Sequence, residues 1–272
     1  DGIRDVAVTG VQTCALPIYK IQNKYTFLFD ARPGDGGTVA ARYVANTPNT
    51  ILVTSSAFFI RATVFPNESY NLSDYTTLMA QCTAPMVITS SKYKSWKDVP
   101  KNQPLNIGTS GLGVTTHMAA LQVVNKYPNV QVVPFKSTSE ALVNMVGGQT
   151  DFHVGFLSEP EAWAKENNKT VNVLGITGNR VTNGHATLAS QGFDPVTDRM
   201  GVPFQLIIPN TISEPKAREL RGILQRAAKA QSVRNSMAID YCHPTEDRRD
   251  LDSWYNEQRE LWKKLAGNVS VK

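Results

Sequence analysis

The chain has 272 residues, 41% of them hydrophobic, with 28 Lys and Arg against 23 Asp and Glu and a formal net charge of +5. The basic residues form no run, which argues against a nucleic-acid partner, and no apolar stretch is long enough to cross a membrane as a helix. The length suits one two-lobed α/β unit or two small domains, and the mild positive charge favours an anionic ligand.

The start of the chain has an unusual sequence. Residues 1–18 read as the in-frame translation of a common sequencing-library adapter with a short index. They contain neither the basic start nor the apolar run of a signal peptide. We therefore expect residues 1–18 to be non-native and leave them out of the fold prediction.

From Tyr25 onward, strand-like and helix-like segments alternate. Apolar, β-rich runs predict strands at 25–29, 51–53, 77–79, 86–89, 104–107, 130–133, 151–156, 171–176 and 204–208. Apolar residues at helical spacing predict helices at about 38–44, 114–124, 137–146, 213–227 and 245–265. This alternation predicts an α/β fold with mostly parallel sheets and helices on both faces.

Local signals support several of these helices. Ser137 and Glu140 have the spacing of a capping box. Pro215 would lie in the first turn after a cap at Ser213. In the first helix, Val39 and Val44 fall on one face together with Tyr43, which predicts that this face is buried.

The segment Gly108–His117 is the most informative part of the chain. It is a glycine- and hydroxyl-rich loop between a predicted strand and a predicted helix. Such a loop directs backbone N–H groups and the positive end of the helix dipole toward one point, which suits a carboxylate or a phosphate. An ordinary helix N-cap would have the same composition, and the residues alone do not separate the two interpretations.

Five segments together resemble the solute receptors of tripartite tricarboxylate transporters. They are Arg32–Gly37, Gly108–His117, Val133–Lys136, Gly147–Asp151 and Leu174–Gly178, which resemble that family's RPGAGG, GSSGxGSSSH, VPYK, GGQxD and LAVTG segments. The resemblance covers about residues 25–265. Each motif is weak alone, whereas the ordered set is fairly specific.

The resemblance implies a type II-like periplasmic binding protein with two α/β lobes and a ligand cleft between them. It implies capture of a small di- or tricarboxylate or aromatic acid in the periplasm, delivery to membrane permease subunits, and neither enzymatic activity nor a cofactor. The lobes would comprise residues 19–104 with 204–272, and residues 105–203, with crossovers near Pro104 and Pro203.

In the family, a strand, a glycine-rich ligand loop and a helix precede the strand that matches Tyr25–Phe29. We therefore expect the first strand and helix of the first lobe to be missing from this chain. The strand should lie inside a sheet, so its absence would leave backbone donors and acceptors unpaired.

Three groups of residues are candidate ligand contacts. Small hydroxyl side chains and bare N–H groups can surround a carboxylate without a competing charge. The candidates are Thr109, Ser110, Gly111, Val114, Thr115 and Thr116 in the glycine-rich loop, Thr54, Ser55, Ser56 and Phe58 at a strand end, and Gly155 and Phe156. Strand-end capping for Thr54–Ser56 and core packing for Phe156 are the alternatives.

Gly155 and Phe156 stand where many relatives carry Asp-Asn. Because glycine cannot pair with a ligand's amino group, this position favours an acid without an α-amine, with an apolar body touching Phe156, Phe58 or Phe59. The four histidines, which are His117, His153, His185 and His243, show no metal-ligand spacing, so no metal is expected.

Other interpretations stay open. An α/β enzyme acting on a small organic acid could use the same loop, although the complete motifs for a nucleophilic serine, a dinucleotide or a Walker lysine are absent. A sensor subunit that presents a bound ligand is a further alternative. Cys82 and Cys242 are either one disulfide or two buried thiols.

Overall fold

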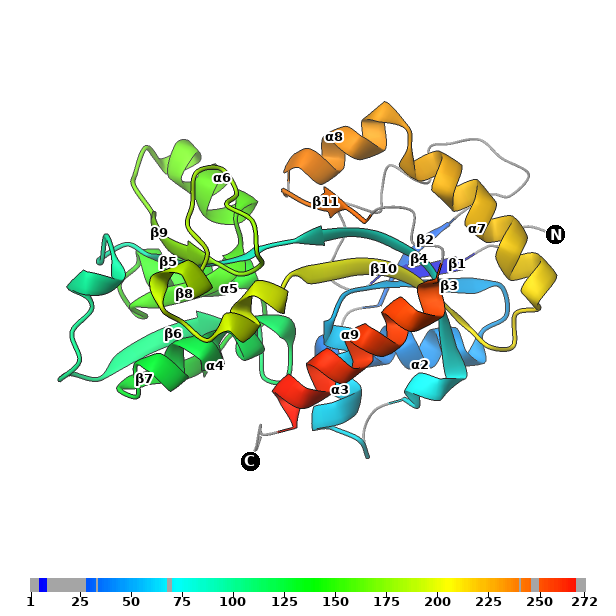
Figure 1. Cartoon of the computed structure of the whole chain (residues 1–272), viewed down its shortest axis with the longest axis horizontal. Coiled ribbons are helices and arrows are strands. Elements are labelled where there is room, and N and C mark those ends of the chain that lie inside the picture. The colour runs from blue at the N-terminus through cyan, green and yellow to red at the C-terminus, as the bar shows by residue number, and fades with distance from the viewer. Residues whose placement is uncertain are drawn as a thin grey trace. The chain divides into compact units, whose positions relative to one another are not determined.

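The computed structural model describes residues 5–8, 28–32, 34–67, 70–239, 241–245 and 250–267. They form two compact units (Figure 1). Unit 1 comprises the described parts of residues 1–83 and 203–272, and unit 2 comprises residues 84–202. Each unit is an α/β structure with its own sheet, as the alternating sequence pattern predicts.

The sheet of unit 1 has the strand order β11-β4-β10-β3-β1-β2. Its strands are β1 (Asp5–Val8), β2 (Phe29–Ala31), β3 (Thr50–Thr54), β4 (Tyr75–Ala84), β10 (Val202–Pro209) and β11 (His243–Pro244). Strand β1 is parallel to β2 and β3, whereas β10 is antiparallel to β3 and β11 is antiparallel to β4. All residues of β3 and β10 are buried, which fits their continuous apolar sequence.

Strand β1 differs from the expectation that this sheet position would be vacant. Asp5–Val8, inside the segment set aside as non-native, lies between β2 and β3, with Val6 opposite Phe29 and Ile51. A position between two strands offers unpaired donors and acceptors on both sides, and a valine-rich segment has the β propensity to occupy it. The remainder of residues 1–18 and most of the predicted strand 25–29 lie outside the described residues.

The helices of unit 1 cover this sheet. They are α2 (Thr38–Asn46), α3 (Ala57–Val64), α7 (Glu214–Ala228), α8 (Gln231–Ile239) and α9 (Leu251–Ala266), with short 3-10 turns at Asp35–Gly37 and Leu72–Asp74. Helix α9 packs against α3 (Figure 1), with Trp262 fully buried and the rings of Tyr255 and Phe59 5.1 Å apart. The predicted inward face of α2 is only partly correct, because Val44 is buried but Val39 is 41% exposed.

A disulfide joins Cys82 on β4 to Cys242, 160 residues later. It resolves the alternatives left open by the sequence in favour of one bridge. The bond lies beside the ladder in which His243 and Pro244 of β11 pair with Thr83 and Cys82. A covalent link and backbone hydrogen bonds therefore hold the short edge strand together.

The sheet of unit 2 has the strand order β7-β6-β8-β5-β9. Its strands are β5 (Met86–Ser90), β6 (Leu105–Thr109), β7 (Val130–Pro134), β8 (Phe152–Phe156) and β9 (Asn172–Ile176), and its helices are α4 (Thr115–Lys126), α5 (Thr138–Val146) and α6 (Ser158–Asn167). Three short 3-10 segments lie at Trp96–Asp98, Ala189–Gln191 and Pro195–Arg199. Strand β6 is parallel to β7 and β8, and only β5 runs antiparallel to its neighbours.

The first boundary between the units lies between Thr83 and Ala84, earlier than the expected crossover near Pro104. The reason is strand β5, which pairs with β8 and β9 and so belongs to unit 2. The second boundary lies between Val202 and Pro203. The sequence indicated that residues 86–89 form a strand, but a strand's sheet is decided by its pairing partners.

Candidate functional site

The candidate residues of unit 2 lie at the carboxyl ends of β6 and β8, which are adjacent and parallel. From β6 the chain passes through α4 to β7, on one side of β6 in the sheet. From β8 it passes through α6 to β9, which lies on the opposite side. Such a reversal is the topological switch point at which open α/β sheets bind ligands. The structure therefore brings the Gly108–His117 loop and the Gly155–Phe156 pair to the same sheet edge.

The loop after β6 is held in shape by its own hydroxyl groups. The Ser110 N–H donates to Thr116 Oγ1 at 3.1 Å, and the two hydroxyl oxygens lie 2.9 Å apart. Thr109 Oγ1 donates to the Gly111 carbonyl at 3.1 Å. Gly111 has φ +124, a conformation that side chains rarely adopt. Ser110 and Thr116 thus form an internal clasp that shapes the turn.

The N-terminus of α4 has no side-chain cap. Its N-cap residue is Val114, whose side chain cannot accept a hydrogen bond, and its first turn contains no acid. The first helical hydrogen bond runs from Met118 N–H to the Val114 carbonyl at 3.2 Å, so the N–H groups of Thr115 and Thr116 precede it. The positive end of this helix dipole therefore has neither a capping side chain from Val114 nor an acid in the first turn beside it.

His117 supports the same loop from inside the helix. Its Nδ1 accepts the Gly113 N–H at 3.0 Å. The side chain is 5% exposed, and burial lowers the pKa of His117 below its usual 6.5. A neutral ring with an unprotonated Nδ1 is the form that can accept this bond. The histidine therefore has a local hydrogen-bonding role at the start of α4.

The other helices that begin near this edge are already supplied with negative charge or caps. Ser137 caps α5 by accepting the Glu140 N–H at 3.0 Å, and Glu140 Oε2 accepts the Lys136 N–H at 3.0 Å. Helix α6 has Glu159 and Glu161 in its first turn. The structure describes all of unit 2, and of its helices α4, α5 and α6, α4 is the one with neither a side-chain cap nor an acid in its first turn.

Glu159 is the residue at this edge that sequence reasoning missed. Its Oε2 accepts the Phe156 N–H at 3.2 Å, and its Oε1 accepts the Thr138 hydroxyl. A Cβ added at Gly155 would lie 2.5 Å from both Glu159 Oε2 and His153 Cε1. The glycine is required by this close approach, and a carboxylate occupies the space that its missing side chain would take.

Because of this contact, Gly155 alone no longer supports the prediction that the ligand lacks an amine. The acidic group that glycine lacks is supplied by Glu159 from the next helix. A signal was present in the sequence, because a glutamate in the first turn of a helix after a strand faces that strand's end. Its contact with Gly155 depends on side-chain packing between β8 and α6.

The ring of His153 lies beneath Gly155. It is 0% exposed, and its Nδ1 lies 3.0 Å from Thr89 Oγ1, whereas its Nε2 has no hydrogen-bond partner. Burial lowers the pKa of His153 to about 4. At neutral pH the imidazole is therefore an uncharged core group.

Solved structures of the same architecture are periplasmic binding proteins. The chain resembles Rpa4515 of R. palustris with adipate (TM-score 0.83, 18% identity, 97% of this chain and 96% of that chain), and the periplasmic binding protein BugD (0.82, 18%, 97% and 98%). It also resembles MatC of Rhodopseudomonas palustris with bound malate (0.80, 20%, 97% and 99%). The chain has a periplasmic-binding-protein fold. No protein-family model and no curated protein sequence matches it.

In unit 1 of this binding-protein fold, Thr54 ends β3, and Ser55 and Ser56 form the turn between β3 and α3. Ser55 Oγ accepts the Ala57 N–H at 3.3 Å, which is a local capping role. Phe58 is 2% exposed; its ring is stacked on Tyr70 at 4.7 Å and meets Tyr75 edge-on at 5.3 Å. Phe58 is therefore part of an aromatic core, a role that sequence reasoning had not considered for it.

The described part of the binding-protein fold contains no group of three or more His, Cys, Asp or Glu side chains that could hold a metal ion. Nor does any helix among the described residues have both the length and the apolar character to cross a membrane.

Proposed function

We propose that the chain is an extracytoplasmic solute-binding receptor that captures a small organic carboxylate. The observation that carries the proposal is the uncapped N-terminus of α4 at the switch point of the unit 2 sheet. Its neighbours α5 and α6 already have caps or acids, so α4 is the one of these three helices in unit 2 whose positive end lacks a negative partner of this kind. The binding-protein fold also supports the proposal of a solute-binding receptor.

The proposal extends to location and partner. The Cys82–Cys242 disulfide supports an oxidising compartment such as the periplasm. The ordered motifs at Arg32–Gly37 and Gly108–His117 support a receptor of the tripartite tricarboxylate type, which would deliver its ligand to membrane permease subunits. The protein would bind and release its acid unchanged, without a cofactor.

The ligand carboxylate would meet the first-turn N–H groups of α4 and the hydroxyls of Ser110 and Thr115. Removing both hydroxyls, by Ser110→Ala and Thr115→Val, should weaken binding by about 1–3 kcal/mol in total. Isothermal titration against citrate, malate, adipate, benzoate and aspartate measures the effect. Ser73→Ala with Thr76→Val, the same changes on unit 1, is the matched control and should leave the affinity unchanged.

A second variant separates binding from stability. Val114→Asp gives α4 the acidic N-cap that it lacks, and such a cap contributes about 0.5–2 kcal/mol. Because Val114 is 8% exposed, the loss of its apolar burial offsets this gain, so the net stability of unit 2 should not rise. The same carboxylate would occupy the anion position and abolish ligand binding. A folded Val114→Asp protein that still binds its acid with full affinity would refute the proposed position. Conversion of the bound acid into a product would favour the enzyme alternative instead.

A further inference from the structure

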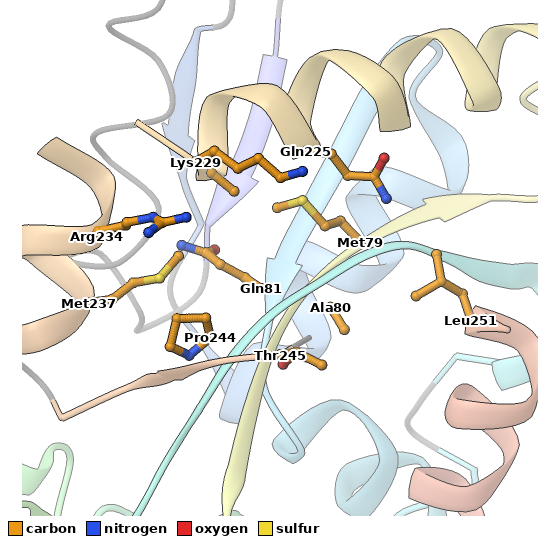
Figure 2. Close-up of a pocket in the computed structure, with 11 residues that line it drawn as sticks. Met79, Ala80, Gln81, Gln225, Lys229, Arg234, Met237, Pro244, Thr245 and Leu251 are labelled. Carbon is orange, nitrogen blue, oxygen red and sulfur yellow. The ribbon is translucent and has the colours of Figure 1, made fainter. Parts of the chain in front are cut away.

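Unit 1 contains a cavity of about 200 Å³ that none of the candidate ligand residues lines (Figure 2). Strand β4 forms its floor with Met79, Ala80 and Gln81. Helices α7 and α8, with Lys229 just after α7, form one side, and Pro244, Thr245 and Leu251 line the other. The cavity is thus built from segments far apart in the sequence, and sequence periodicity could not have indicated it.

The wall on the β11 side is firmly fixed. Cys242 is bonded to Cys82, the residue next to Gln81, and Pro244 pairs with Cys82 in the strand ladder. The Thr245 N–H donates to the Gln81 carbonyl at 3.1 Å. The Cys242 N–H donates to the Met237 carbonyl at 2.9 Å, which fixes the end of α8 to the same wall. These contacts therefore hold β11, Thr245 and the end of α8 against the floor of the cavity.

The lining combines positive charge with apolar surface. Lys229 and Arg234 are the charged residues among the described lining, and Gln81 and Gln225 add amide groups. Figure 2 shows the side chains of Arg234 and Gln81 reaching into the cavity from α8 and β4. Gln81 is 4% exposed, so it belongs to the buried floor of the cavity.

The apolar part of the lining comes from Met79, Met237 and Leu251, which surround the floor. Water would hydrate the cations and amides but not these surfaces. Methionine sulfur makes favourable contacts with aromatic rings. An aromatic ring with one negative group satisfies both kinds of surface. The size agrees, because a cavity of about 150 Å³ holds benzene.

We propose that this cavity is a second ligand site, which binds a small aromatic monocarboxylate. The carboxylate would meet Arg234 and Lys229, and the ring would lie between the two methionine side chains. The site belongs to unit 1 and is separate from the α4 N-terminus of unit 2. It does not depend on the proposed receptor function.

The chain's methionines make a direct test possible. Of the six methionines, Met79 and Met237 line the cavity, whereas Met118 lies in the first turn of α4 in unit 2. Protein labelled with ¹³C-methyl methionine is titrated with benzoate. We expect saturable shifts of the Met79 and Met237 methyl signals. Shifts confined to Met118, or no saturable shift at Met79 and Met237, would overturn the second site.

Two comparisons define the chemistry of the site. Lys229→Gln with Arg234→Gln replaces two exposed cations and should raise the dissociation constant reported by Met79 and Met237 about tenfold or more. Benzyl alcohol, which has the ring without the charge, should bind about tenfold more weakly than benzoate. Equal affinity in either comparison would contradict an anion site. If inorganic sulfate bound with the same affinity as benzoate, the proposal that the ligand is aromatic would be contradicted.

The Ser110→Ala and Thr115→Val protein is the matched control. It should leave the titration of Met79 and Met237 unchanged, because Ser110 and Thr115 lie in unit 2, whereas the cavity lies in unit 1. If this variant abolished the Met79 and Met237 shifts, the cavity would not be an independent site. If the receptor proposal were wrong, this double variant would instead show an unchanged titration of the Met118 methyl signal.

Discussion

Unit 2 should lose stability in mild acid because of one buried imidazole, that of His153. Burial lowers its pKa to about 4 in the folded state, against 6.5 for a free histidine. Between these values the unfolded chain binds a proton that the folded chain does not, so stability falls as pH falls. At 1.36 kcal/mol per pKa unit, this shift can lower the unfolding free energy of unit 2 by at most about 3 kcal/mol. Of this, about 2 kcal/mol is lost between pH 7 and pH 4.5.

The assay must distinguish the two units, because they can unfold separately. The four tryptophans allow this: Trp96 and Trp163 lie in unit 2, and Trp254 and Trp262 lie in unit 1. Protein labelled with 5-fluorotryptophan is unfolded in urea at pH 7 and pH 4.5 and followed by ¹⁹F NMR. The Trp96 ring lies 5.9 Å from Phe152, the neighbour of His153, so it reports directly on β8.

The control is His153→Asn, whose amide can keep a hydrogen bond to Thr89 Oγ1 without a titrating ring. His117 also has a pKa lowered by burial, and it contributes equally in both proteins. The pH dependence of the unit 2 transition should therefore be smaller in the variant by about 2 kcal/mol. If wild type and variant lost the same stability between pH 7 and pH 4.5, the reasoning about His153 would be refuted.

Three further changes test the fold. Replacing both Cys82 and Cys242 by serine should lower the unfolding free energy of unit 1 by up to about 5 kcal/mol, which is the chain-entropy limit for a loop of 160 residues. The urea unfolding transition reported by Trp262 measures this loss. Gly155→Ala should destabilise unit 2 by about 1–3 kcal/mol in the same assay, because its Cβ would lie 2.5 Å from neighbouring side-chain atoms; an unchanged midpoint would contradict that packing. Ser137→Ala should cost about 1 kcal/mol through loss of the α5 cap, whereas Ser137→Thr should restore most of it.

Local sequence patterns predicted the elements that depend on neighbouring residues. The Ser137 cap is present, and Leu220, Ile223 and Leu224 face the core of unit 1 from α7, because helical periodicity places them on one side. The tryptophan-rich face of α9 is buried for the same reason. Val39 shows the limit of such reasoning, since a periodic pattern does not tell how wide the covered face is.

The sequence by itself determined the α/β class, the order of the strands in unit 2 with helices α4 and α5, and the glycine-rich loop before α4, whereas α6 was not predicted. These features follow from residue types at fixed spacing along one segment. Tertiary structure decided which sheet β5 joins, that Asp5–Val8 lies between β2 and β3, and that Cys82 is bonded to Cys242. It also placed the Glu159 carboxylate beside Gly155 and built the cavity under α8. Each of these depends on contacts between distant segments, which no local pattern encodes.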